Sequence, residues 1–72
     1  MITLKYITHK YSLPLEYTLF QYQNNESFFV YVGDTLIGSI AKAGDRWVQV
    51  SGRDLGDSNI NEIGEFIDKT VV

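Results

Sequence analysis

The stretch FFVYVGDTLI, residues Phe28–Ile37, decides the fold of this 72-residue chain. It opens with an unbroken run of aromatic and β-branched residues, which favours an extended strand. Gly33-Asp34 then suits a two-residue hairpin turn with glycine first, and a second β-favouring run follows it. Because the run before the turn does not alternate apolar with polar residues, we expect that strand to be buried on both sides.

The same composition recurs on both sides of this hairpin. Asn24-Asn25 and Ala43-Gly44-Asp45 are turn-formers, and connections this short force neighbouring strands to be antiparallel. Residues 2–8 alternate loosely and predict a preceding strand. The expected result is an antiparallel meander of four or five strands, of which the four clearest are Leu15–Gln23, Ser27–Val32, Thr35–Ala41 and Arg46–Val50.

After Gly52 the periodicity changes to that of a helix. Ile60, Ile63 and Ile67 recur at helical spacing, and we expect the helix to end near Thr70. Gly64 costs a helix roughly 1 kcal/mol relative to alanine, so a close approach to the sheet is its most plausible role. The residues suited to cap the helix are Asp57, Ser58 and Asn59.

These elements predict one α+β domain over residues 1–72, an antiparallel meander of four to five strands with one C-terminal helix packed on one sheet face. The three turns set a register that sorts the side chains onto two faces. The first face is mainly aromatic and carries Phe20, Tyr22, Phe29, Tyr31, Leu36, Ile40 and Trp47. The second carries Tyr17, Leu19, Phe28, Val30, Val32, Ile37, Val48 and Val50.

Both predicted faces are apolar, although a single helix presents only one apolar stripe. Large uncovered apolar patches on monomers are rare and usually mark an interface. We expect the helix to cover the aliphatic face. The aromatic face would then meet the N-terminal segment, a second copy of the chain, or a ligand.

Composition narrows the function classes. The chain has no cysteine, which excludes disulfides, thiolate metal sites and thiol catalysis. Its net charge is −3 and its six basic residues are scattered, so nucleic acid is an unfavoured partner. We find neither a signal peptide nor a membrane-spanning segment, and therefore expect a soluble, cytoplasmic protein with no membrane partner.

The aromatic face supplies the candidate site. We expect a small, non-enzymatic protein-interaction domain that self-associates as a dimer, or binds another protein, through aromatic anchors. One alternative is a single-stranded nucleic-acid module that uses the same rings for stacking. A second is an acidic inhibitor or immunity-type protein, because Glu62, Glu65 and Asp68 form an acidic helix side. The candidate interface residues are Phe20, Tyr22, Phe29, Tyr31, Ile40 and Trp47.

Signals for catalysis or metal binding are weak. His9 is the only histidine, and the sequence indicates no partner that would orient it as a base. Asp54, Asp57 and Asn59 loosely resemble a calcium loop, but the glycine and glutamate of that pattern are misplaced, and turn chemistry explains all three. We therefore expect no catalytic residue, no metal site and no cofactor, and rank a ligand pocket or enzyme site between helix and sheet last.

Overall fold

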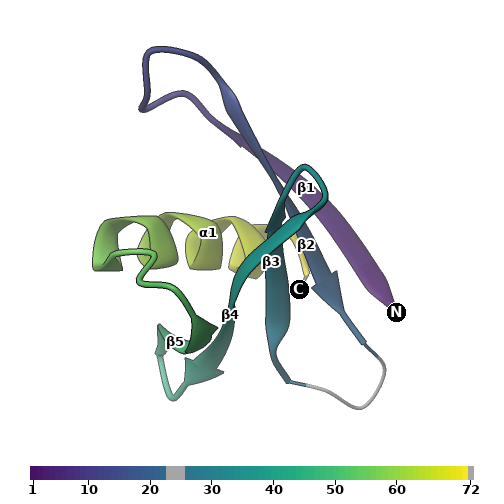
Figure 1. Ribbon diagram of the computed structural model, residues 1–72. Coiled ribbons are helices and arrows are strands. Elements are labelled where there is room, and N and C mark those ends of the chain that lie inside the picture. The colour runs from purple at the N-terminus through teal and green to yellow at the C-terminus, as the bar shows by residue number, and fades with distance from the viewer. Residues whose placement is uncertain (23–25, 72) are drawn as a thin grey trace.

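The computed structural model describes residues 1–22 and 26–71 and shows one antiparallel sheet with a helix against it (Figure 1). The strands are neighbours in chain order, so the predicted α+β meander with one C-terminal helix is confirmed, with five strands. Their bounds are β1 (Ile2–Thr8), β2 (Leu15–Gln21), β3 (Phe28–Val32), β4 (Thr35–Ala43) and β5 (Arg46–Gly52), followed by α1 (Asp57–Thr70).

The N-terminal segment joins the sheet. β1 pairs with β2 without a register shift, from Ile2 opposite Gln21 to Thr8 opposite Leu15. It is therefore an edge strand of the same sheet and does not fold over the aromatic face. The sequence left three possible covers for the aromatic face, and this pairing excludes one of them, the chain's own N-terminal segment.

The described turns lie where the sequence predicts them, except that one is shifted by one residue. Val32 pairs with Thr35 across Gly33-Asp34, as predicted. Ala43 pairs with Arg46, so the next turn is Gly44-Asp45 and not the predicted Ala43-Gly44. The predicted Asn24-Asn25 turn lies outside the described residues, although its consequence, Phe20 opposite Phe29, is confirmed.

Two irregularities interrupt the ladder, and the first overturns part of the predicted face assignment. The β3–β4 register shifts between Val30 and Tyr31, so Val30 pairs with Gly38 instead of Ile37. Because one extra residue turns every later side chain to the opposite face, this shift makes the prediction wrong for Ile40, Trp47 and Val48. A second shift, between Ser39 and Ile40 in the β4–β5 ladder, lies past Trp47 and Val48 and does not change their face.

The core lies between α1 and the sheet face it covers. This face is the aliphatic one, as expected, with Leu19 and Val30 fully buried at its centre. Ile40 joins them, also with no exposed surface. The buried hydrophobic residues are Tyr17, Leu19, Phe28, Val30, Ile37, Ile40, Ile60, Ile63 and Ile67.

Gly64 brings α1 close to the sheet, as the sequence predicts. A β-carbon at this position would lie 2.2 Å from Cδ1 of Trp47, so the indole occupies the space that a side chain would need. Trp47 thus packs under the helix and has its ring centroid 6.0 Å from that of Phe28.

The helix begins differently from the prediction. Its N-cap is Gly56, which makes no side-chain capping bond, and none of the three predicted caps serves. The first helical bond runs from the Ile60 amide to the Gly56 carbonyl, 3.0 Å. Asp54 Oδ1 accepts the Gly56 amide at 2.9 Å and fixes the turn before the helix.

Candidate protein-binding face

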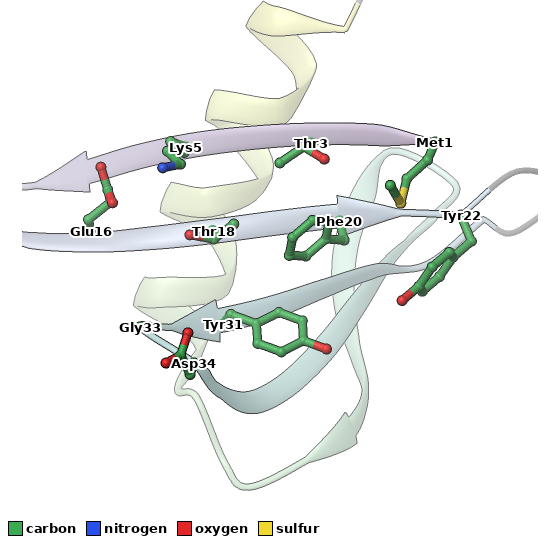
Figure 2. A pocket seen from close by; sticks show the side chains of 10 residues that line it. All are labelled: Met1, Thr3, Lys5, Glu16, Thr18, Phe20, Tyr22, Tyr31, Gly33 and Asp34. Atoms are coloured by element: carbon green, nitrogen blue, oxygen red, sulfur yellow. The ribbon is translucent and has the colours of Figure 1, made fainter.

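The outer face is the sheet face turned away from α1. Strand alternation places Thr3, Phe20 and Phe29 side by side on it, since Thr3 lies opposite Phe20 and Phe20 opposite Phe29. Figure 2 looks onto this face with α1 behind the sheet, and shows the rings of Phe20, Tyr22 and Tyr31 turned toward the viewer.

Four rings form the centre of this face, and we call Phe20, Tyr22, Phe29 and Tyr31 the aromatic quartet. Phe20 and Tyr31 meet edge to face, with ring centroids 5.3 Å apart and planes at 86°. Tyr22 and Phe29 do the same at 5.6 Å and 67°. Such pairs hold each ring in a defined orientation. Tyr22 remains 52% exposed and the other three are half-buried.

The patch continues onto β4 and β5. Leu36 lies opposite Tyr31 and is 50% exposed. Val48 lies opposite Ala41, and both belong to the outer face because Ile40 points into the core. Within the described part of the chain, no helix or strand forms a layer over these side chains.

The structure brings together four of the six candidate interface residues, the members of the aromatic quartet. Ile40 and Trp47 lie on the other face, where Ile40 has no exposed surface and Trp47 packs against Gly64. The sequence gives no signal for the register shift that separates them. The prediction also missed Thr3 and Lys5, because the register of β1 was not set by a short turn, and it missed Thr18 because only apolar side chains were assigned to the face.

Polar and charged side chains frame one end of the outer face. Lys5 pairs with Thr18, and Glu16 lies one position further along β2 on the same side. Together with Asp34, they border a shallow hollow of about 770 Å³ that runs along the quartet (Figure 2). The rim therefore carries both signs of charge, while the quartet itself is uncharged.

A second cluster ties the β1 end of the sheet to α1. The Tyr6 hydroxyl donates to Glu62, and Lys10 Nζ lies 3.5 Å from the same carboxylate. Lys10 Nζ also donates to Asn59 Oδ1 at 2.8 Å. Hydrogen bonds from the hydroxyls of Thr8 and Tyr6 hold the pKa of Glu62 below its usual range. The same Glu62 contact, with desolvation, raises the pKa of Tyr6 to about 12.

Asp68 forms the corresponding contact on the opposite flank of the helix. Lys42 Nζ donates to Asp68 Oδ1 at 3.0 Å, and Trp47 Nε1 donates to Oδ2 at 3.3 Å. The hydrogen bond from Lys42 lowers the pKa of Asp68. In the expected acidic stripe of Glu62, Glu65 and Asp68, two of the three carboxylates are therefore paired within the chain, while Glu65 and Asp68 remain exposed.

The remaining candidates do not assemble into a site. His9 is exposed in the loop between β1 and β2. Among the residues the structure describes, no group of three His, Asp or Glu side chains is placed to hold a metal ion. In the same residues, no helix is both long and apolar enough to cross a membrane.

Comparison of the chain with protein-family models, with curated proteins and with solved structures finds no match.

Proposed function

We propose that this protein is a non-enzymatic interaction module that self-associates by packing the aromatic quartet of one copy against that of another. The observation that supports this proposal is the uncovered outer face, whose rings are ordered in edge-to-face pairs but remain half-exposed. Exposed apolar patches of this kind are costly in a monomer and are typical of interfaces.

The size of the outer face suits a protein partner. Strands about 4.8 Å apart that rise about 3.3 Å per residue give a five-stranded face an area of roughly 500 Å². Two such faces would together bury roughly 1,000 Å², the size at which specific interfaces begin. An interface smaller than this would bind weakly, so we expect the fraction of dimer to rise with protein concentration over the measurable range.

Charge favours a second copy over nucleic acid. The quartet carries no charge, so two copies can meet without burying an unpaired ion. Lys5 is the one basic residue among those bordering the hollow, beside Glu16 and Asp34, and the chain has a net charge of −3. Stacking platforms for single strands are flanked by clusters of basic residues that neutralise phosphates, whereas this face carries two isolated ones, Lys5 on β1 and Arg46 on β5.

The acidic-inhibitor alternative loses support for a separate reason. Glu62 and Asp68 are already engaged by Tyr6 and Lys42 within the chain. A basic partner would have to break these contacts to use the two carboxylates, so the helix side offers it little.

The proposal predicts that truncating two half-exposed apolar side chains of the outer face weakens association. Tyr22→Ser combined with Leu36→Ser removes two residues that are 52% and 50% exposed, so the fold should survive. We expect a dissociation constant raised at least about tenfold in sedimentation equilibrium, since each anchor contributes on the order of 1 kcal/mol or more.

Leu13→Ser is the matched control, because Leu13 is 76% exposed in the β1–β2 loop, away from the outer face. This control should associate as the unmodified chain does. An unchanged dissociation constant in the double variant would contradict the proposal. Tight, salt-sensitive binding of a fluorescent single-stranded oligonucleotide would contradict it in favour of the stacking alternative.

A further inference from the structure

The two edges of the sheet differ in how they are protected. The β5 edge follows a ladder irregularity, and past Gly52 the Arg53 amide still donates to the Ile37 carbonyl of β4 at 3.2 Å. The Gln49 side chain occupies backbone groups at the end of β5 and just after it, accepting from the Leu55 amide at 3.0 Å and donating to the Ser51 carbonyl at 2.9 Å. A bulge and occupied backbone groups of this kind make an edge less able to pair with another strand.

The β1 edge has none of these protections among the described residues. β1 pairs with β2 over its whole length without an irregularity, and it contains no proline. In an antiparallel ladder, alternate residues of an edge strand direct their N–H and C=O groups outward, where they are free to pair. Lys5 is the only charge in β1 and stands on the outer face; it is the one feature of this strand that opposes edge pairing, and the register proposed below keeps it away from the second copy's Lys5.

The side chains of β1 are also incompletely buried. Ile2, Leu4 and Tyr6 point to the helix side and pack against the margin of the core, and each is only half-buried. A strand added beside β1 would cover this row and satisfy the outward backbone groups at the same time.

We propose that β1 pairs antiparallel with β1 of a second copy, about a two-fold axis at Leu4, to form one continuous ten-stranded sheet. Antiparallel pairing of identical strands is two-fold symmetric, so the same edge serves both copies. Both helices then lie on the same side of the joined sheet.

The register follows from the side chains of β1. Helices on one side require paired residues to share a face, which restricts the axis to a residue position. An axis at Lys5 sets two lysines directly opposite each other, which is destabilising. An axis at Leu4 instead sets Lys5 opposite Thr3, Ile2 opposite Tyr6, and Leu4 opposite its own copy.

An axis at Tyr6 is the remaining alternative, because it pairs a similar number of β1 residues between the two copies. It leaves Ile2 outside the paired region and sets Lys5 opposite Ile7, which places a charge against an apolar side chain. The Leu4 axis pairs the apolar side chains of the helix side with one another and is therefore preferred.

This contact does not use the aromatic quartet, and it leaves both outer faces uncovered on one side of the joined sheet. It is therefore independent of the proposed function. A chain that uses the edge or the face alone forms a dimer, whereas one that uses both forms larger assemblies with two distinct contacts.

Single-cysteine crosslinking tests the pairing, since the chain has no cysteine of its own. In the proposed register Thr3 of one copy faces Lys5 of the other, within the Cα separation that a disulfide needs. We expect Thr3→Cys and Lys5→Cys proteins, mixed and oxidised with copper phenanthroline, to form a mixed disulfide dimer identified by mass spectrometry. Its formation should be roughly tenfold faster than random collision allows, because pairing raises the effective thiol concentration.

Three comparisons decide the outcome. Leu4→Cys should crosslink to itself, while Thr3→Cys alone and Lys5→Cys alone should react no faster than Asn61→Cys, an exposed control on α1. Self-crosslinking of Lys5→Cys in place of the mixed dimer would overturn the register. A mixed pair no faster than the Asn61→Cys control would overturn the edge contact itself, and because Thr3 and Lys5 are exposed, misfolding is not expected to cause that result.

The same variants separate this inference from the proposed function. Crosslinking that persists when Tyr22→Ser and Leu36→Ser are added supports edge pairing, whatever those substitutions do to face packing. Crosslinking that disappears with them would overturn edge pairing as an independent contact.

Discussion

At the scale of single residues, the close approach of Gly64 and Trp47 explains how the helix is seated. A glycine inside an otherwise good amphipathic helix predicts such an approach from the sequence alone. The identity of its partner could not be predicted, because the β3–β4 register shift turned Ile40, and with it Trp47, from the expected aromatic face to the helix side. The strongest aromatic candidate for the interface is thus a packing residue.

Gly64→Ala should destabilise the fold although alanine favours helix. The added β-carbon would lie 2.2 Å from Trp47 Cδ1, and such overpacking costs about 1–3 kcal/mol, against about 1 kcal/mol gained in helix propensity. We expect a net loss of up to roughly 2 kcal/mol in urea unfolding followed by Trp47 fluorescence. Glu65→Ala, on the exposed side of the same helix, should change stability by less than about 0.5 kcal/mol. Equal stability of the two variants would contradict this account of Gly64.

Glu62, with its hydrogen bonds to Thr8 and Tyr6, should make stability depend on pH at both extremes. The lowered pKa of Glu62 means that the unfolded chain binds its proton more readily, so stability falls as pH drops below the ordinary value of 4.5. The pKa of Tyr6 is raised to about 12, so here the folded chain holds the proton longer, and stability falls as pH rises from 10 toward 12.

Tyr6→Phe isolates this contribution. Without the hydroxyl, the alkaline loss of stability should become shallower and the acid loss should shrink in urea titrations across the pH range. Parallel stability curves for Tyr6→Phe and the unmodified chain would rule out the contact as the cause.

At the scale of the elements, the sequence was sufficient beside the Gly33-Asp34 turn, whereas the next turn, Gly44-Asp45, was placed one residue too early. Gly33-Asp34 fixes Val32 opposite Thr35, and that pairing is observed. Counted from this turn, the predicted β3–β4 pairing fails beyond the pair Tyr31–Leu36. Nothing in the composition of β4 marks the extra residue that causes the shift. Gly38 is the nearest indication, since it allows the backbone of β4 to approach Gly52 closely. A glycine within a strand can mark a bulge, a bend or a close contact, so Gly38 alone does not locate the shift.

The same β3–β4 register shift separates the candidate interface residues that share a face from those that do not. The aromatic quartet lies on β2 and β3, whose mutual register was predicted correctly, and so all four rings share a face. Ile40 and Trp47 lie beyond the shift and do not. The contacts of Tyr6 and Lys10 with α1 were out of reach of the sequence, because Tyr6 and Glu62 are separated by 56 positions and no turn connects them.

The β1 edge yields a prediction in which local pairing and overall charge have opposite effects. In the proposed register, residue 3 faces Lys5 of the other copy twice per dimer, at roughly 0.2–1 kcal/mol for each charge pair. Thr3→Glu should therefore tighten the edge dimer and Thr3→Lys should loosen it, with dissociation constants about tenfold apart in sedimentation equilibrium at low salt.

General electrostatics predicts the reverse order. The chain has a net charge of −3, so an added glutamate increases the repulsion between copies and an added lysine reduces it. Thr35→Glu and Thr35→Lys, exposed at the start of β4, should show only this general effect. If the Thr3 variants follow the order of the Thr35 variants, the cross-strand pairing is absent.

At the scale of the whole molecule, one helix and one sheet leave a side of the sheet without a second layer. The N-terminal segment, which could have supplied that layer, extends the sheet instead. The folded chain therefore exposes an aromatic face and an unprotected edge at once. Both features are explained if this 8.2 kDa domain gains part of its stability from further copies of itself, as small domains without disulfides or metals often do.

The most direct test of self-association through the outer face is molar mass by light scattering after size exclusion, over a concentration series. The unmodified chain and the Tyr22→Ser, Leu36→Ser double variant should be measured side by side. We predict that the unmodified chain rises to at least twice its monomer mass of 8.2 kDa and that the double variant reaches half the mass of the unmodified chain at the same concentration. A mass of 8.2 kDa for the unmodified chain throughout the series, or an identical rise for both proteins, would contradict the claim.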